Sequence, residues 1–246
     1  MVEIHRHGVT EPKGWKKKVA RALGDAKAFD RKARAFERLA LDHPKRLPGF
    51  PAYAGRAMLP EGDFPAVWRR AKALKAALYA MTEGHCAYCQ KAIERATVEH
   101  VRPKSLFPTL AYCVDNYLPT CTECNEAKSN RWPAEGAYVR PDAGDPAPRF
   151  VFGAHGEMWA APGDEEAHAT IWDIGLDRAA LRKMRRVRIE QAMKTLRPIL
   201  EALGVPEAVR VAHVKRYLVS QLSPFSEAMN QSVRRAWGLA FPRLPL

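Results

Sequence analysis

Two pairs of cysteines, and the polar residues between and beside them, are the part of this 246-residue chain best suited to chemistry. The pairs read Cys86-Ala-Tyr-Cys89 and Cys121-Thr-Glu-Cys124, and they contain four of the five cysteines. Two CxxC pairs are typical of a structural zinc site, in which four thiolates fill all four tetrahedral positions. Such a Zn²⁺ ion has no open position for a substrate. We therefore predict a structural zinc, and catalysis would need a second metal position.

The residues between and beside the pairs offer oxygen and imidazole groups for such a position. Glu99 and His100 lie between the pairs with Asn116, and Asn125 follows the last cysteine directly. Taken singly, each has a structural explanation, because Glu99 could be an exposed strand residue and His100 a core histidine. Asn116 could likewise be a turn residue and Asn125 a helix surface residue. Their placement within a double CxxC frame favours catalysis instead.

A small strand, loop, strand and helix unit is predicted to carry these residues. Residues 96–101 are rich in β-branched side chains, 112–120 can supply an antiparallel partner, and a helix is expected from Thr122. Successive side chains of a strand point to opposite faces, so Glu99 and His100 share a cleft only if the strand end is twisted or bulged. Asn125 and Lys128 share one helix face because they are three residues apart.

The ordered motifs resemble the HNH endonuclease signature, whose fold is a zinc-stabilised ββα-metal, or treble-clef-like, finger. The resemblance is carried by Glu99-His100, Asn116 and Cys121-Thr-Glu-Cys124-Asn125. A longer pattern is similar to PtuB-type HNH endonucleases, which accompany Septu and some retron anti-phage systems. It consists of Cys86-Ala-Tyr-Cys89, Val98-Glu-His-Val-Arg-Pro-Lys-Ser105, Asp115-Asn-Tyr-Leu118 and the second cysteine pair through Lys128. Residues 170–178 and 223–226 resemble the C-terminal part of that family less specifically.

The resemblance implies a role for each central residue. His100 would be the general base that deprotonates a water for attack on the scissile phosphate. Glu99 and Asn125 would hold one divalent cation, Mg²⁺ or Mn²⁺, and Asn116 would brace the loop that carries His100. Three basic residues would contact phosphates: Arg102, Lys104 and Lys128. The resemblance also implies a role in anti-phage defence and a partner ATPase of the PtuA type.

Two positions differ from many HNH enzymes. Glu99 stands where Asp is frequent, which lengthens the side chain and keeps its charge. Asn125 stands where His is frequent, which favours Mg²⁺ or Mn²⁺ over a soft metal. Neither difference predicts an inactive enzyme.

The charge balance predicts a polyanionic partner. The chain has 40 Lys and Arg against 27 Asp and Glu, a net charge of +13. Such an excess attracts nucleic acid and releases its counterions, although a merely basic surface is the alternative explanation. DNA is the favoured substrate over RNA. The active-site residues do not decide between them, because an attacking water makes no use of a 2′-hydroxyl.

A cytoplasmic protein is expected. Residues 1–18 lack the apolar core of a signal peptide, and no apolar run reaches the roughly 18 residues of a membrane span. A reducing cytoplasm argues against disulfides and for metal-bound cysteines. The fifth cysteine, Cys113, is expected to be a small buried apolar residue rather than a nucleophile.

Helices are predicted on both sides of the central stretch, around one short hairpin. The expected helices cover 15–41, about 65–81, a basic segment from Asp173 or Asp177 to near Pro198, 206–222 and 225–238, with a hairpin at 149–160. Residues 44–63 are expected to form a loop, and Trp68 a core position. The basic residues of 15–41 and 178–197 are predicted to bind DNA or a partner; solvated helix faces are the alternative.

These observations predict an α+β chain that is predominantly helical, with a central zinc-stabilised finger. Its expected regions are 1–82, a basic helical region, 83–133, the nuclease finger, and 134–246, with a hairpin and helices. The expected function is metal-dependent hydrolysis of phosphodiester bonds. Two alternatives are an RNA-directed HNH nuclease and a non-catalytic zinc module that binds nucleic acid or protein. The second would not require Glu99 and His100 together with Asn125.

Overall fold

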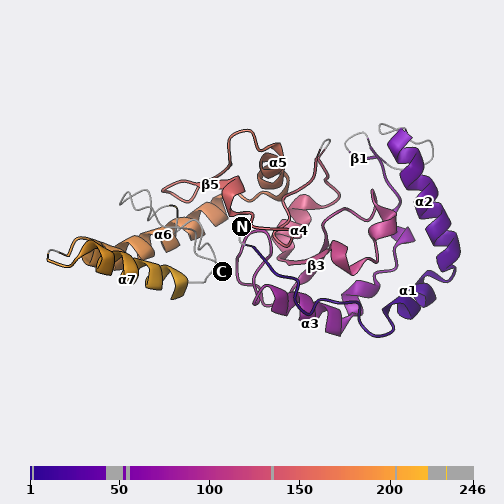
Figure 1. Ribbon diagram of the computed structural model, residues 1–246. Helices are drawn as coiled ribbons and strands as arrows, with labels where there is room; N and C mark the ends of the chain where they lie inside the picture. Colours follow the sequence, from indigo (N-terminus) through magenta and orange to yellow (C-terminus); the bar gives the residue numbers. More distant parts are fainter. Residues whose placement is uncertain are drawn as a thin grey trace. The chain divides into compact units, whose positions relative to one another are not determined.

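The computed structural model describes residues 1, 3–42, 52–53, 56–133, 136–202, 204–220 and 231, as helices and small two-stranded sheets (Figure 1). They fall into two units. The finger unit comprises His5–Cys86 and Ile93–Tyr138, and the C-terminal unit comprises Met1–Ile4, Ala87–Ala92 and Val139–Leu246. This grouping divides the chain differently from the three predicted regions: the N-terminal helices share a unit with most of the predicted finger, and residues 87–92 of that finger belong to the other unit. No helix of the described residues is long and apolar enough to cross a membrane.

Two helices, α1 (Trp15–Leu23) and α2 (Ala26–Asp42), replace the single helix predicted over 15–41. The break is at Gly24, whose φ of 70° lies in the left-handed region that glycine adopts readily. Asp25 then accepts a hydrogen bond from the Ala28 amide at 2.8 Å. Ser, Thr, Asn and Asp are preferred at such helix starts because they satisfy free amides of the first turn.

The next helical segment is also divided. A 3-10 turn, η1 (Glu61–Asp63), precedes η2 (Val67–Arg70), which is followed by α3 (Lys72–Met81). Ala71, at φ −84° and ψ 80°, leaves the helical region between η2 and α3. Half of the predicted loop 44–63 lies outside the described residues; the other half comprises β1 (Ala52–Tyr53), β2 (Arg56–Ala57) and residues 58–63.

The predicted strand, loop, strand and helix are confirmed in the finger unit. They are β3 (Thr97–His100), β4 (Tyr117–Thr120) and α4 (Thr122–Lys128), with 3-10 turns η3 (Pro108–Leu110) and η4 (Val114–Asn116) between the strands. The strands are antiparallel, and Glu99 lies opposite Leu118 and His100 opposite Tyr117. Strand β4 starts later than predicted, because residues 114–116 form the second 3-10 turn.

Aromatic and aliphatic side chains from these elements form one hydrophobic core. Its buried members include Trp15, Phe36, Phe64, Trp68, Leu74, Leu78, Val98 and Tyr117. Trp68 is 5% exposed, so it is a core residue as predicted. The N-terminal helices are therefore packed into the same core as the finger, which explains why the two form one unit.

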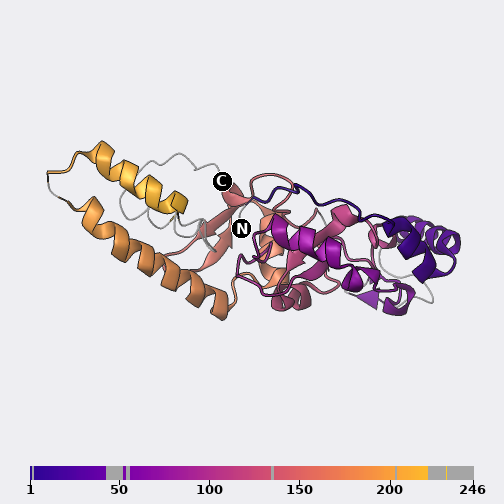
Figure 2. The same cartoon turned by 90° about the horizontal axis from the view of Figure 1, so that it is seen from below.

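The described residues of the C-terminal unit form the predicted hairpin and three helices (Figures 1 and 2). A turn, η5 (Ala147–Arg149), leads into β5 (Phe150–Phe152) and β6 (Met158–Ala160), followed by α5 (Glu165–Ile174), α6 (Ala179–Leu200) and α7 (Glu207–Ser220). Helix α5 was not predicted, although Asp164 at its start and Gly175 at its end are the usual signals. Pro198 lies inside α6, which continues to Leu200. The helix predicted over 225–238 lies outside the described residues, except Gln231.

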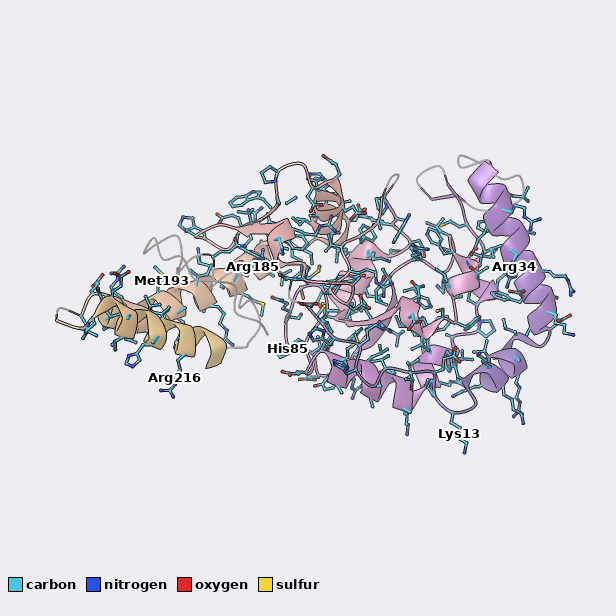
Figure 3. All side chains as sticks on the ribbon, viewed as in Figure 1. Lys13, Arg34, His85, Arg185, Met193 and Arg216 are labelled. Atoms are coloured by element: carbon cyan, nitrogen blue, oxygen red, sulfur yellow. The ribbon has the colours of Figure 1, made fainter. Side chains whose placement is uncertain are left out.

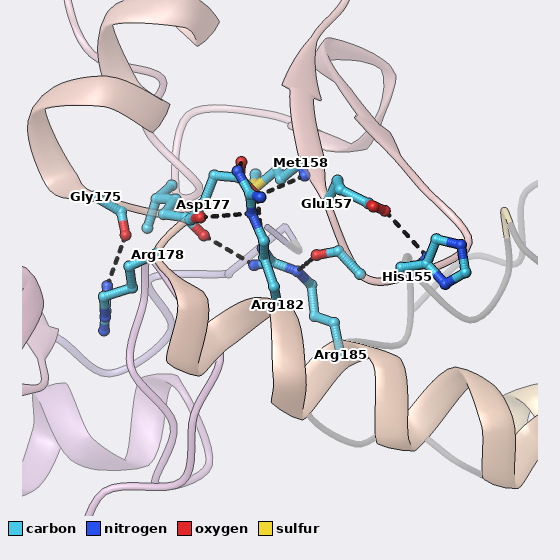
Figure 4. Close-up of polar contacts among 10 residues, drawn as sticks. His155, Glu157, Met158, Gly175, Asp177, Arg178, Arg182 and Arg185 are labelled. Carbon is cyan, nitrogen blue, oxygen red and sulfur yellow. Dashed lines mark hydrogen bonds and ion pairs between the residues drawn. The ribbon is translucent and has the colours of Figure 1, made fainter.

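A buried arginine joins α6 to the hairpin (Figure 4). Arg185 is 2% exposed, and its guanidinium donates to the carbonyls of Gly156 at 2.6 Å and Leu176 at 2.9 Å. It also lies 3.3 Å from Asp177, which accepts from the Met158 amide and pairs with Arg182. Burial lowers the pKa of Arg185 to about 10, so the side chain stays charged at neutral pH. Arg185 is therefore a structural residue and not part of the basic surface predicted over 178–197.

Candidate functional site

The four paired cysteines converge as the zinc prediction requires. Their sulfur atoms all lie within 4.8 Å of one another, and all four side chains are buried. Tetrahedral zinc with Zn–S bonds of about 2.3 Å places its sulfurs about 3.8 Å apart, so the cluster fits a zinc ion with little movement. Cys113 stands apart from the cluster and is half-buried rather than fully buried.

A cleft of about 680 Å³ runs along β3 in the finger unit. It is lined by Trp68, Arg69, Lys75, every residue from Arg95 to His100, Pro103, Lys104, Thr122, Asn125, Ser129 and Asn130. Glu99, His100 and Asn125 therefore meet in one cleft. Residues of both strand faces contribute because the cleft follows the strand lengthwise. Glu99 and His100 thus border the same cleft although neighbouring side chains of a strand point to opposite faces.

His100 is held in one tautomer. Its Nε2 lies 3.0 Å from the Ala111 carbonyl, which also accepts the Tyr117 hydroxyl at 2.7 Å. A carbonyl oxygen can only accept, so Nε2 carries the proton and Nδ1 keeps its lone pair. Trp68 and Tyr117 pack edge-on against the ring, at centroid distances of 4.7 and 4.9 Å. The imidazole is thus oriented from three directions.

His100 is neutral at ordinary pH. Burial is the main reason that its pKa is lowered to about 3, and the nearby Lys104 and Lys128 act in the same direction. The Ala111 carbonyl opposes this shift, because it accepts a proton that the ring carries. A neutral imidazole with a free Nδ1 lone pair is the form that can accept a proton from water.

Glu99 forms a buried ion pair with Lys128. The carboxylate Oε1 lies 2.5 Å from the Lys128 ammonium, and the two side chains are 4% and 0% exposed. Among the described residues Oε1 accepts no well-directed hydrogen bond, so the contact is mainly one of charge. Burial raises the pKa of the Glu99 carboxyl, while the Lys128 ammonium opposes that rise. Lys128 therefore favours the ionised form of Glu99, although the side chain is buried.

Lys128 is engaged with protein groups in this arrangement, and the phosphate contact expected of it stays a prediction. Its ammonium also donates to the His100 carbonyl at 2.9 Å and lies 5.7 Å from the centroid of the Tyr138 ring. With no exposed surface, it cannot reach a phosphate without leaving its partners. It joins α4 to β3 and positions Glu99 beside His100.

Asn116 spans the loop that follows His100. Its side-chain oxygen accepts from the Arg102 amide at 2.9 Å, and its nitrogen donates to the Arg102 carbonyl at 2.9 Å and the Leu110 carbonyl at 3.4 Å. It is buried and does not line the cleft. These are the contacts expected of a bracing residue, and its catalytic contribution stays a prediction.

The N-terminal elements brace the same loop, which sequence reasoning missed. Arg6 donates to the carbonyls of Val114 at 2.8 Å and Tyr117 at 3.0 Å, and Trp15 donates to the Tyr112 carbonyl at 3.0 Å. The Glu37 carboxylate of α2 accepts from the Thr109 amide at 2.8 Å and the Thr109 hydroxyl at 2.7 Å. These bonds join positions far apart in the chain, so no local pattern announces them.

Of the other two basic residues predicted to contact phosphates, Lys104 lines the cleft and Arg102 does not. Lys104 lines the cleft, with its ammonium 5.5 Å from the Phe64 ring centroid. Arg102 is exposed and lies over Phe107 at 5.6 Å, outside the cleft lining. Further basic residues that the prediction missed also line the cleft, namely Arg69, Lys75 and Arg95. They were visible in the sequence, but only the fold shows which basic side chains face the cleft.

The basic helices predicted as binding surfaces are partly engaged with acids. Arg34 is exposed on α2 (Figure 3). It pairs with Asp30 at 2.8 Å, and Lys32 lies 2.7 Å from Asp63. Their binding to DNA or a partner stays a prediction.

Comparison with known proteins finds a family match for the central segment. Residues 86–131 match the family model described as HNH endonuclease. The matched segment is under a fifth of the chain and contains all four clustered cysteines with Glu99, His100, Asn116 and Asn125. No curated protein and no solved structure matches the chain. The match supports an HNH endonuclease domain, and hence a nuclease, in this segment.

Proposed function

We propose that the protein is a metal-dependent endonuclease that hydrolyses phosphodiester bonds in the cleft along β3. One observation carries the proposal: a buried histidine, fixed as the Nε2–H tautomer, lines one cleft with a buried carboxylate and an amide, within a segment that matches the HNH family. A purely structural zinc module has no need of that set.

His100 serves as the general base. Its Nδ1 lone pair takes a proton from a water molecule, which then attacks the phosphorus atom. Before substrate binds, burial strongly disfavours the charged ring, as its lowered pKa shows. A phosphodiester in the cleft brings a negative charge close to the ring, which raises the pKa of His100 and favours proton transfer. The base is therefore strengthened by the substrate that it acts on.

Glu99 and Asn125 hold the divalent cation. A carboxylate and an amide oxygen are hard donors, and Mg²⁺ is usually bound through one or two carboxylates with waters and substrate phosphates completing the shell. The donor set thus fits Mg²⁺ or Mn²⁺. When bound, the cation neutralises phosphate charge and stabilises the leaving oxygen. Lys128 favours the ionised form of Glu99 and holds it in place, and Asn116 fixes the backbone that follows His100.

The clustered cysteines hold a structural Zn²⁺. Their four buried sulfurs match a closed tetrahedral site, and binding ties the start of α4 to the first cysteine pair. Because all four positions are filled by protein, this ion takes no part in the reaction.

DNA is the proposed substrate, and the wider setting is anti-phage defence with a PtuA-type partner ATPase. The excess of basic residues in the cleft supports a nucleic-acid substrate. The defence role and the partner rest on the similarity of the central pattern to PtuB-type nucleases. Co-expression with an ATPase encoded beside this gene tests the partner directly: a stable complex supports it, and separate elution contradicts it.

Plasmid cleavage tests the proposed reaction. Wild type with Mg²⁺ is expected to nick or linearise supercoiled DNA, whereas His100→Ala is expected to be inactive while keeping its zinc and its circular dichroism spectrum. Lys72→Ala serves as a control, because Lys72 is exposed on α3 and does not line the cleft. Equal cleavage by wild type and His100→Ala contradicts the proposal, as does no cleavage by wild type even with its partner present.

The same assay separates the two alternatives. An RNA-directed nuclease would cleave a matched RNA strand faster than the DNA strand of the same sequence. A non-catalytic zinc module would bind either strand and cleave neither, with or without divalent cations.

A further inference from the structure

Cations outside the predicted site residues give the cleft an excess of positive charge. Arg69 comes from η2, Lys75 from α3 and Arg95 from the residues just before β3; we call these three the cleft cations. Lys104 adds a fourth positive charge. Among the described residues that line this cleft, Glu99 is the only acid, and its charge is matched by Lys128. The cleft is therefore built to attract a polyanion.

The cleft cations are not committed to carboxylates. In the part of the chain that the structure describes, none of the three forms an ion pair. By contrast, Lys32 and Arg34 on α2 lie close to acids. A basic side chain without an acidic partner can take up a phosphate and release a counterion without first breaking a bridge.

The cleft also has a direction. It is lined by every residue from Arg95 to His100, so its floor follows β3 from one end to the other. An extended chain covers at most about 3.6 Å per residue, which places Arg95 up to roughly 18 Å from His100. One strand of duplex DNA carries a phosphate for every ~3.4 Å of helix rise. Arg95 can thus contact a phosphate of the same strand that is a few positions or fewer from one held at His100.

We propose that the substrate strand lies along β3, with its scissile phosphate beside His100 and neighbouring phosphates held by Arg69, Lys75 and Arg95. This rests on the proposed function, which fixes where the scissile phosphate sits. Arg69 and Lys75 lie outside the segment that matches the HNH family. The N-terminal part of the finger unit is then a part of the substrate site as well as a support for its loop.

The chain supplies matched controls for two of the cleft cations. Arg70 follows Arg69 in η2, and Lys72 precedes Lys75 in α3; both are exposed and neither lines the cleft. Arg70→Ala and Lys72→Ala remove the same charge from the same elements. Any effect of overall charge is therefore common to the control and the test variant, and only position differs.

Binding without cleavage is the decisive measurement. In a His100→Ala background, with zinc retained and no divalent cation added, fluorescence anisotropy gives the affinity for labelled oligonucleotides across a range of salt concentrations. Single-stranded and duplex DNA and the matching RNA are compared. The salt slope is the slope of the logarithm of the binding constant against the logarithm of the salt concentration. Each cleft-cation variant is expected to reduce its magnitude by about 0.7 for a single strand or about 0.9 for a duplex, and the control variants are expected to leave it unchanged. Asn125→Ala provides a second inactive background.

Kinetics of the active protein give an independent readout. Loss of a contact made equally in the ground and transition states raises KM and leaves kcat unchanged. Arg95→Ala, far from the scissile phosphate, is expected to show this pattern, in contrast to the loss of kcat in His100→Ala. A fall in kcat alone for Arg95→Ala would contradict the strand path.

The outcomes are separable from those of the proposed function. If wild type cleaves but the cleft-cation variants bind like Arg70→Ala and Lys72→Ala, the strand does not run along β3 and the nuclease assignment stands. If the variants lower the salt slope but wild type never cleaves, the strand path stands and the catalytic proposal fails.

Discussion

The cysteine cluster and the cleft along β3 lie in the same short segment, yet they are built for opposite purposes. The cluster has four identical soft donors, all buried, which leave no position for a ligand from outside. The cleft brings together a carboxylate, an imidazole and an amide beside open space. Lys128 holds the carboxylate of Glu99, and the Ala111 carbonyl holds the imidazole of His100.

The difference shows how one small finger can separate stability from chemistry. A closed metal site tolerates no change in its ligands, because the segment depends on the metal to fold. A cleft residue can be replaced with loss of reaction but retention of the fold, provided that its neighbours keep their partners. The two regions should therefore respond to substitution in opposite ways.

The largest effect is expected from the cluster. Cys121→Ser should lose zinc and unfold the finger, because structural zinc contributes on the order of 10 kcal/mol to such small segments. Zinc content and thermal unfolding measure this. Cys113→Ser is the matched control, since Cys113 lies outside the cluster and should keep both zinc and stability. A Cys121→Ser protein with full zinc and an unchanged melting temperature would overturn the contrast.

The opposite pattern is expected from His100→Gln. Removing the proposed general base should lower kcat by roughly 10²- to 10⁴-fold, while zinc content is retained. Glutamine can still donate to the Ala111 carbonyl, which limits the disturbance of the fold. Single-turnover cleavage beside zinc analysis makes the measurement. Loss of zinc together with activity would mean that the cleft and the cluster are not separable.

Lys128→Met should reveal the cost of leaving Glu99 buried and alone. Breaking one partner of a buried ion pair typically costs about 3–5 kcal/mol. The free energy of unfolding, from urea denaturation of zinc-loaded protein, is expected to fall by this order. Adding Glu99→Gln should recover much of the loss, because the uncompensated charge is removed. If the double variant is as unstable as the single one, the pair is not coupled in this way.

A pH-dependent loss of stability is expected from His100. Its pKa is lowered from 6.5 to about 3 in the folded state, so between these values the unfolded chain binds the extra proton. The stability contributed by the neutral ring is present above pH 6.5 and falls by about 1.4 kcal/mol for each unit below it. Unfolding at pH 7 and pH 5.5, without divalent cations, tests this. His100→Gln should lose this component, and an equal slope in both proteins would contradict it.

The smallest effect is expected from Glu37, which holds the loop between β3 and β4 at Thr109. Glu37→Gln weakens the bonds to the Thr109 amide and hydroxyl, and a bond to a charged group contributes about 1.5–3 kcal/mol, of which glutamine retains part. We expect a loss of about 1 kcal/mol and a modest drop in cleavage. Asp30→Asn, on the same helix, removes only an exposed pair and should cost less. Equal losses would show that the brace is not specific.

Local pattern was enough to predict much of the finger. The spacing of the cysteines predicted their cluster, and β-branched residues before Arg102-Pro103 predicted β3. Helix α5 could also have been found, because Asp164 and Gly175 flank it with ordinary start and stop signals. The break between α1 and α2 needed more weight on Gly24, whose positive φ ends the first helix.

Contacts between distant residues could not be predicted in the same way. Lys128 was expected to meet phosphate, because a lysine one turn from Asn125 has no local sign of burial. The placement of α4 against β3 instead gives it two partners, Glu99 and the His100 carbonyl. Arg6, Trp15 and Glu37 likewise bond to a loop about 70 to 110 positions away.

The sequence by itself determined which chemistry is present: soft sulfur donors in two pairs, and a carboxylate, imidazole and amides between and beside them. Residue type fixes donor hardness and the reference pKa of each group, before burial and neighbours act on it. Only the tertiary structure decided which nitrogen of His100 is free, which lysine is buried and which basic residues face the cleft. Those properties depend on burial and on partners from other elements, and packing alone brings these together.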